Sequence, residues 1–79
     1  MALVICVAPA GQGWAVSSEA LETHLTFARG ARAEAAARAL ADRCAEAGRH
    51  AEVQIYLRDG ALAGRFLHPA HQDHRSGLG

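Results

Sequence analysis

The sequence predicts an α+β fold, in which one five-stranded mixed sheet is covered on one face by a single helix. Five short segments are either apolar on both sides or alternate in polarity with the period of two that is typical of strands. One longer segment, between the third and fourth of these, has the spacing of an amphipathic helix. The expected element order is therefore β-β-β-α-β-β, and a chain of 79 residues forms one domain of this kind.

The first predicted strand, residues 3–8, is apolar on both faces, which favours a central position in the sheet. One face carries Leu3, Ile5 and Val7, and the other carries Val4, Cys6 and Ala8. A turn-forming cluster follows at residues 9–13, and Trp14 and Val16 then alternate in a short second strand.

The third predicted strand, residues 21–27, follows a turn at residues 17–19 and alternates cleanly. One face carries Leu21, Thr23, Leu25 and Phe27, and the other carries Glu22, His24 and Thr26. This alternation predicts a half-buried strand with one solvated side.

Residues 31–47 consist of strong helix formers without a proline, and they predict the helix. Its apolar stripe is expected to comprise Ala33, Ala36 or Ala37, Leu40, Cys44 and Ala47. Glu34 and Arg38 are four residues apart and form a favourable ion pair, and Gly48 follows the last turn as a C-cap.

A hairpin follows, because residues 52–57 and 62–67 alternate around Asp59-Gly60, a dipeptide that favours a two-residue type I′ turn. Counting outward from this turn gives the expected register. It pairs Leu57 with Leu62, Ile55 with Gly64 and Val53 with Phe66 on one face, and Tyr56 with Ala63 and Gln54 with Arg65 on the other.

A right-handed crossover through the helix places the fourth strand parallel to the first and beside it. The predicted strand order is therefore 3-2-1-4-5. We expect residues 1–67 to form the domain and residues 68–79, which lack any hydrophobic period, to form a flexible His-rich tail.

Composition excludes several classes of function. The chain has eight arginines, no lysine and a net charge of zero, and its cations are interspersed with acids, which argues against direct nucleic-acid binding. No stretch approaches the roughly 18 apolar residues of a membrane span, and the N-terminus lacks the features of a secretory signal. We therefore expect a cytoplasmic protein, in which the two widely spaced cysteines stay reduced.

The sequence resembles a small bacterial domain family of unknown function with the pattern Val-x-Pro, Gly-Gly-Trp-x-Val, helix and Asp-Gly hairpin. The matching residues are Val7, Pro9, Gly11, Gly13, Trp14, Val16, Phe27, the helix and Asp59-Gly60, and the chain departs from the pattern at Gln12, where glycine is common. The resemblance covers roughly residues 3–67. It implies a small α+β fold and supplies no catalytic residues.

Few residues have the arrangement of a chemical site, so we expect no enzymatic activity, no cofactor and no metal. His68, His71 and His74 form the one metal-like cluster, but no second pair of ligands accompanies them. Gly11-Gln-Gly13 precedes a strand rather than a helix, unlike a phosphate-binding loop. Cys6 and Cys44 lie on apolar segments and are expected to pack in the core.

One helix cannot cover both faces of five strands, so the sequence predicts a protein-binding or self-associating module that uses the open sheet face or an edge strand. The candidate interface residues are Val4, Cys6, His24, Tyr56, Ala63, Arg65 and Leu67. We expect a homodimer, with another protein as a further partner. The alternative function is a phage or plasmid accessory protein, such as an anti-CRISPR inhibitor that binds a nucleoprotein effector, by analogy of size and element order.

Overall fold

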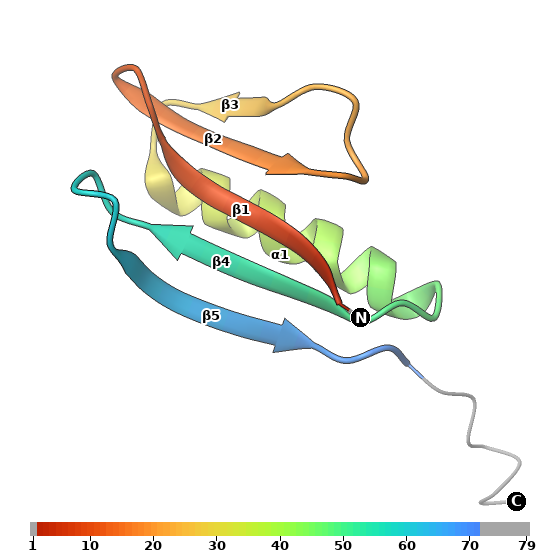
Figure 1. The fold of residues 1–79 in the computed structure, drawn as a ribbon. Helices are drawn as coiled ribbons and strands as arrows, with labels where there is room; N and C mark the ends of the chain where they lie inside the picture. The colour runs from red at the N-terminus through yellow and green to blue at the C-terminus, as the bar shows by residue number, and fades with distance from the viewer. Residues whose placement is uncertain (1, 72–79) are drawn as a thin grey trace, which may run out of the picture.

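The computed structural model describes residues 2–71 and confirms the predicted architecture (Figure 1). The elements are β1 (Leu3–Ala10), β2 (Gly13–Ser18), β3 (Leu25–Phe27), α1 (Gly30–Glu46), β4 (Ala51–Tyr56) and β5 (Leu62–His68). The strands form one sheet in the order β3-β2-β1-β4-β5. The β1–β4 pair is parallel and the other pairs are antiparallel, and α1 lies behind the sheet in Figure 1.

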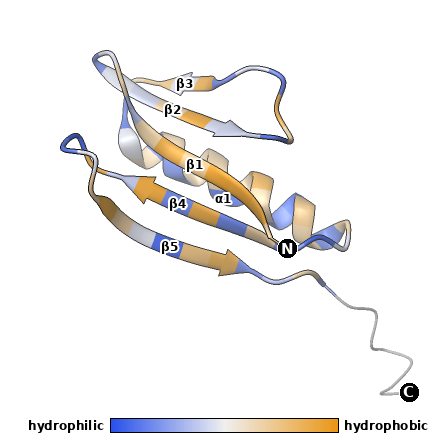
Figure 2. Cartoon of the chain, in the orientation of Figure 1, coloured by the Kyte–Doolittle hydropathy of each residue, from blue (hydrophilic) through white to orange (hydrophobic). Residues whose placement is uncertain are grey.

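The core lies between α1 and the three central strands. Its largest fully buried side chains are Ile5, Val7, Val16 and Val53. They pack with the buried alanines of the helix, and β1 is the most continuously apolar strand in Figure 2. The central position predicted for the doubly apolar strand is therefore confirmed.

The face that α1 buries differs slightly from the prediction. The fully buried positions repeat every four residues and are Ala33, Ala37, Ala41 and Ala45. Ala36, Leu40 and Cys44 are only half-buried beside them, and Ala47 is exposed. Because alanine projects no further than its Cβ, the helix can lie close against the sheet, and the bulkier Leu40 and Cys44 fit along its flank.

The helix ends as predicted. Gly48 has a φ of +90°, the left-handed conformation that glycine adopts without strain. The Arg49 amide donates to the carbonyl of Cys44 over 2.9 Å, which completes the C-terminal cap. The expected ion pair between Glu34 and Arg38 is also present, at 2.9 Å.

The prediction of a long third strand was wrong, because β3 comprises only residues 25–27. The chain first turns at Ser18, whose backbone carbonyl accepts from the Leu21 amide and whose hydroxyl accepts from the Ala20 amide. Residues 19–24 then form the connection, so Leu21 and His24 lie outside the strand. The alternation in this segment is typical of a strand, but the amides of Ala20 and Leu21 bond to Ser18 in a local turn instead of to a neighbouring strand.

The hairpin between β4 and β5 has the predicted register over most of its length, although its turn differs. A type I′ turn requires a positive φ at both of its central residues. No non-glycine residue in the described part has a positive φ, so the φ of Asp59 is negative and the turn is not of type I′. The Gly60 amide donates instead to Leu57, and the loop has three residues, 58–60. Tyr56 therefore pairs with Leu62, which replaces the expected pairs Leu57–Leu62 and Tyr56–Ala63.

A β-bulge then restores the predicted pairing. Ala63 is the extra residue, and beyond it Ile55 pairs with Gly64, Gln54 with Arg65 and Val53 with Phe66. The additional loop residue and the bulge shift the register by one residue each, in opposite senses. The longer turn therefore leaves the faces of β5 beyond Gly64 where the sequence predicted them.

The chain remains packed beyond the expected domain boundary at Leu67. His68 belongs to β5 and pairs with Ala51. The Ala70 amide donates to Nδ1 of His50 over 2.9 Å, and the His71 amide donates to the carbonyl of Ala45 over 2.8 Å. The rest of the expected tail, residues 72–79, lies outside the described residues.

Candidate interaction surface

The face of the sheet opposite α1 carries no helix in the described part of the chain (Figure 1). The strand register assigns to it Val4, Cys6, Ala8, Ala15, Ser17, Thr26, Glu52, Gln54, Tyr56, Leu62, Arg65 and Leu67. Five of the candidate interface residues therefore share this face: Val4, Cys6, Tyr56, Arg65 and Leu67. Ala63 lies at the bulge beside it, and His24 lies in the connection before β3.

A row of hydrogen-bonded polar side chains runs along β4 on this open face. The hydroxyl of Tyr56 donates to Oε1 of Gln54 over 2.8 Å, and Nε2 of Gln54 donates to Oε2 of Glu52 over 2.7 Å. From β5, Nε of Arg65 donates to the same Glu52 oxygen over 3.0 Å. These polar side chains already bond to one another, so most of them would keep a hydrogen bond if another protein covered this face.

The bonds from Arg65 and then from Gln54 lower the pKa of the Glu52 carboxyl, because both stabilise its ionised form. The same pairing raises the pKa of Arg65. Since the pKa of Glu52 is lower in the folded than in the unfolded state, the pair stabilises the fold above the unfolded pKa. This contribution is lost as the pH falls through the folded pKa.

Replacing Arg65 by glutamine should raise the pKa of Glu52 toward its ordinary value, because the charged donor is lost. An NMR titration of the Glu52 carboxyl carbon through the acidic range measures this shift. Arg58→Gln is the matched control, because Arg58 bonds elsewhere, to the β1–β2 turn, and should leave the titration unchanged. An unchanged Glu52 titration in Arg65→Gln would contradict the assigned pair.

Exposed apolar side chains gather on β5 and the turn that precedes it. Six large hydrophobic residues are exposed in the described part of the chain, and four of them are Leu57, Leu62, Phe66 and Leu67. Leu67 is the most exposed, at 60%. Since β5 lies at the sheet edge, this cluster, which we call the β5 patch, borders both the open face and the edge.

The helix-facing side of β5 is also poorly covered. The guanidinium of Arg38 lies 4.4 Å from the centre of the Phe66 ring, a cation–π distance. The ring extends along its own strand over Gly64, where an added Cβ would lie 3.1 Å from ring atom Cε2. Phe66 nevertheless remains 38% exposed, so the Arg38 side chain covers its ring only in part.

At one end of the strands, Arg58 extends from the β4–β5 turn to the β1–β2 turn and connects the two. Its guanidinium lies 5.6 Å from the Trp14 ring centre and donates to the carbonyls of Gly11, Gln12 and Gly13 over 3.4–3.5 Å. Trp14 also lies against Gly30, where an added Cβ would be 3.0 Å from the indole. These contacts assign Trp14 a packing role.

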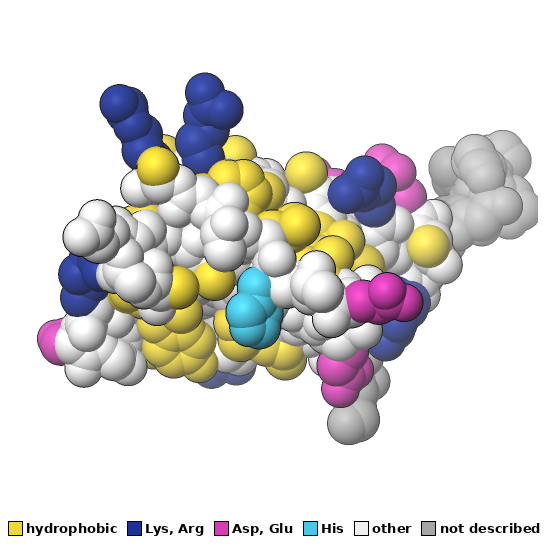
Figure 3. Space-filling model, turned by 90° about the horizontal axis from the view of Figure 1, so that it is seen from above, with side chains coloured by type: hydrophobic (Ala, Val, Ile, Leu, Met, Phe, Trp, Pro, Cys, Tyr) yellow, Lys and Arg dark blue, Asp and Glu magenta, His cyan; other side chains and the backbone are white. Residues whose placement is uncertain are grey.

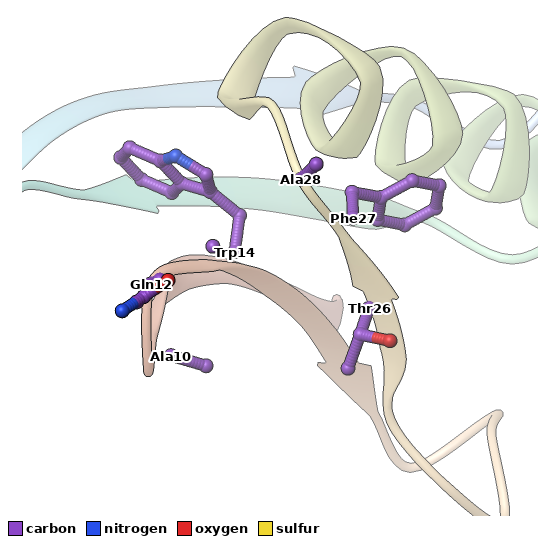
Figure 4. A pocket seen from close by; sticks show the side chains of 7 residues that line it. Ala10, Gln12, Trp14, Thr26, Phe27 and Ala28 are labelled. Atoms are coloured by element: carbon purple, nitrogen blue, oxygen red, sulfur yellow. The ribbon is translucent and has the colours of Figure 1, made fainter.

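Two open hollows adjoin β3 at this end. Figure 3, which looks down on the edge of β3, shows yellow hydrophobic groups separated by white backbone and side chains and by charged residues. The residues that line the hollows are Ala10, Gln12, Gly13, Trp14, Thr26, Phe27, Ala28, Arg29 and Arg32. In Figure 4, Trp14 and Phe27 point toward the helix side, and Ala10 and Thr26 point to the other. This lining offers no carboxylate, imidazole or thiol for proton transfer or nucleophilic attack.

The histidines singled out in the sequence take structural contacts where the structure describes them. Nδ1 of His68 lies 2.9 Å from a carboxylate oxygen of Asp42 on α1. His71 is exposed, and His74 lies outside the described residues. Residues 2–71 contain no group of three or more side chains placed to hold a metal ion. Cys6 and Cys44 form no disulfide, and both are half-buried rather than packed in the core as expected. Cys6 lies on the open face and Cys44 on the flank of the helix.

The chain was compared with protein families, curated proteins and solved structures. No family model matches it. Neither does any curated protein or solved structure. The family resemblance inferred from the Trp and glycine pattern therefore stays a prediction, and function has to be argued from the geometry. Within residues 2–71, α1 is too short and too polar to cross a membrane.

Proposed function

We propose that this chain is a non-enzymatic protein-binding module that self-associates, using the β5 patch and the adjoining open face of the sheet. The observation that carries the proposal is the concentration of exposed apolar side chains in the β5 patch. Leu62 and Leu67 lie on the open face and Phe66 lies on the helix-facing side of the same strand, so this edge exposes apolar side chains on both faces. Exposed apolar side chains that gather in one region are typical of protein interfaces.

The row of polar side chains on the open face supports the same function. Burying a polar group costs free energy mainly when it loses its hydrogen-bonding partners. Here the carboxylate of Glu52 already accepts from Gln54 and Arg65, and Gln54 already accepts from Tyr56. A partner that covers this surface therefore gains the apolar contacts of Leu67 and Leu62 at a reduced desolvation cost.

The non-enzymatic part of the proposal is supported by the surroundings of the titratable side chains. The carboxylates of Glu52 and Asp42 are engaged by Arg65 and His68 on the surface, and they do not line the hollows beside β3. A general acid or base requires a cleft in which substrate lies within hydrogen-bonding reach.

Sedimentation of the chain from micromolar to near-millimolar concentration tests self-association. We expect the mass to rise from the 8.3 kDa of one chain toward twice that value. Leu67→Ser should weaken this association at least tenfold. Leu25→Ser is the matched control, because Leu25 is also exposed but lies on β3, at the opposite edge. An 8.3 kDa species throughout the range would overturn the proposal.

A further inference from the structure

We infer that the outer edge of β5 pairs antiparallel with β5 of a second copy, which joins the two sheets into one. This inference rests on the proposed self-association and places the contact between copies at the β5 edge, beside the open face rather than across it. An edge strand presents unpaired amide and carbonyl groups that a strand of another chain can complete. The two edges of this sheet, β3 and β5, differ sharply in how well they are protected.

The β3 edge is short, since it has three residues, whereas β5 has seven. Short edge strands, bulges, lysines, prolines and covering helices are the features that prevent edge pairing in monomeric proteins. The chain has no lysine, Pro69 follows the strand, and the bulge at Ala63 affects only its beginning. Within residues 2–71, none of these protective features covers the stretch 64–68, which forms a regular part of the edge.

Charge favours a second copy as the partner. Apart from His68, Arg65 is the only ionisable residue in β5, and its charge is paired with that of Glu52 in the same chain. His68, at the end of the strand, is paired with Asp42. Each edge therefore carries no uncompensated charge, and two copies can approach without net repulsion. Apolar side chains at the end of β5 would then meet the same strand of the partner across a two-fold axis.

The register follows from symmetry and from the sequence of the strand. In a continuous sheet, residues directly opposite one another lie on the same face. One residue must therefore lie opposite its own copy, with the two-fold axis midway between the two, and the axis is named below by that residue. An axis at Arg65 would oppose two guanidinium groups, and an axis at Gly64 would place Arg65 against the bulged Ala63 of the partner. An axis at Leu67 would require Pro69, which has no amide hydrogen, to face Arg65.

An axis at Phe66 uses all five regular residues. It places Phe66 opposite the partner's Phe66, and Arg65 opposite the partner's Leu67. Each Phe66 ring is already held over Gly64 and remains partly exposed, so the two rings are available to contact each other across the axis.

Amide hydrogen exchange on the unmodified chain tests the edge directly. We expect alternate amides within residues 64–68 to exchange at least tenfold more slowly at concentrations where the dimer forms than in dilute monomer. The amides of β1, which are already paired on both sides, serve as the internal control and should not change in this way. Dimerisation without added protection in β5 would reject the edge but retain the proposed self-association.

Cysteine crosslinking tests the register. In a chain with Cys6→Ser and Cys44→Ala, Phe66→Cys should form a covalent dimer on mild oxidation, because opposed Cβ atoms lie about 4.5–5.5 Å apart. Leu67→Cys is the control, and the two variants are compared at concentrations where sedimentation shows the same dimer fraction. Its counterpart lies on the diagonal at about 7–8 Å and should crosslink much more slowly. Equal or reversed rates would overturn the axis at Phe66. An unaltered circular dichroism spectrum confirms that each variant is folded.

Discussion

Ile5→Ala should lower the free energy of unfolding by about 2–5 kcal/mol, one of the largest effects expected of a single side chain here. Ile5 lies in β1 and is completely buried. Truncation removes apolar contacts and leaves a cavity, and the surrounding alanines and valines of the core are too small to fill it. A chain of this length has a total stability of only about 4–12 kcal/mol, so the variant approaches the limit of folding.

Urea denaturation followed by circular dichroism measures this loss. Ile5→Val should fall between the wild type and Ile5→Ala, with a cost of about 0.5–1.5 kcal/mol. Val4→Ala is the control, because Val4 is the next residue of the same strand but lies on the open face and is 40% exposed. If Val4→Ala proved as costly as Ile5→Ala, the two faces of the sheet would have been assigned the wrong way round.

The topology could be predicted because its determinants are local in the sequence. The doubly apolar segment of β1 and the C-cap and composition of α1 are visible without coordinates, and the crossover rule then fixes the order of the strands. The details that failed depend on competition between local conformations. Hydrogen bonds to Ser18 form a turn where the first half of the third strand was expected. Asp59 lacks the positive φ that a type I′ turn requires.

The candidate surface was only partly predictable. The open face follows from counting one helix against five strands, and the ion pair between Arg65 and Glu52 could have been found as a diagonal neighbour in the predicted register. The contact between His68 and Asp42 could not, because it depends on how α1 is rotated against the sheet. The exposure of Phe66 was also hidden, since the residue shares the helix-facing side with buried Val53.

The rotation of the helix leads to a second large effect. Ala37→Leu should lower the free energy of unfolding by about 1–3 kcal/mol, because the added carbon atoms have no space between α1 and the sheet. Ala37 is completely buried in the middle of the alanine stripe. The larger side chain would have to displace the helix or adopt a strained rotamer, and either change weakens the packing of Ile5 and Val53.

The matched control is Ala39→Leu, which makes the same chemical change two residues along the helix, at an exposed position. Alanine and leucine have similar helix propensities, so the difference between the two variants isolates packing against the sheet. The control should change stability by no more than about 0.5 kcal/mol. Thermal unfolding offers an independent measurement, because a loss of 1 kcal/mol lowers the Tm of a domain of this size by about 4–8 °C. Equal decreases in Tm for the two variants would mean that α1 presents a different face to the sheet. The close packing of the alanine stripe against the core would then be contradicted.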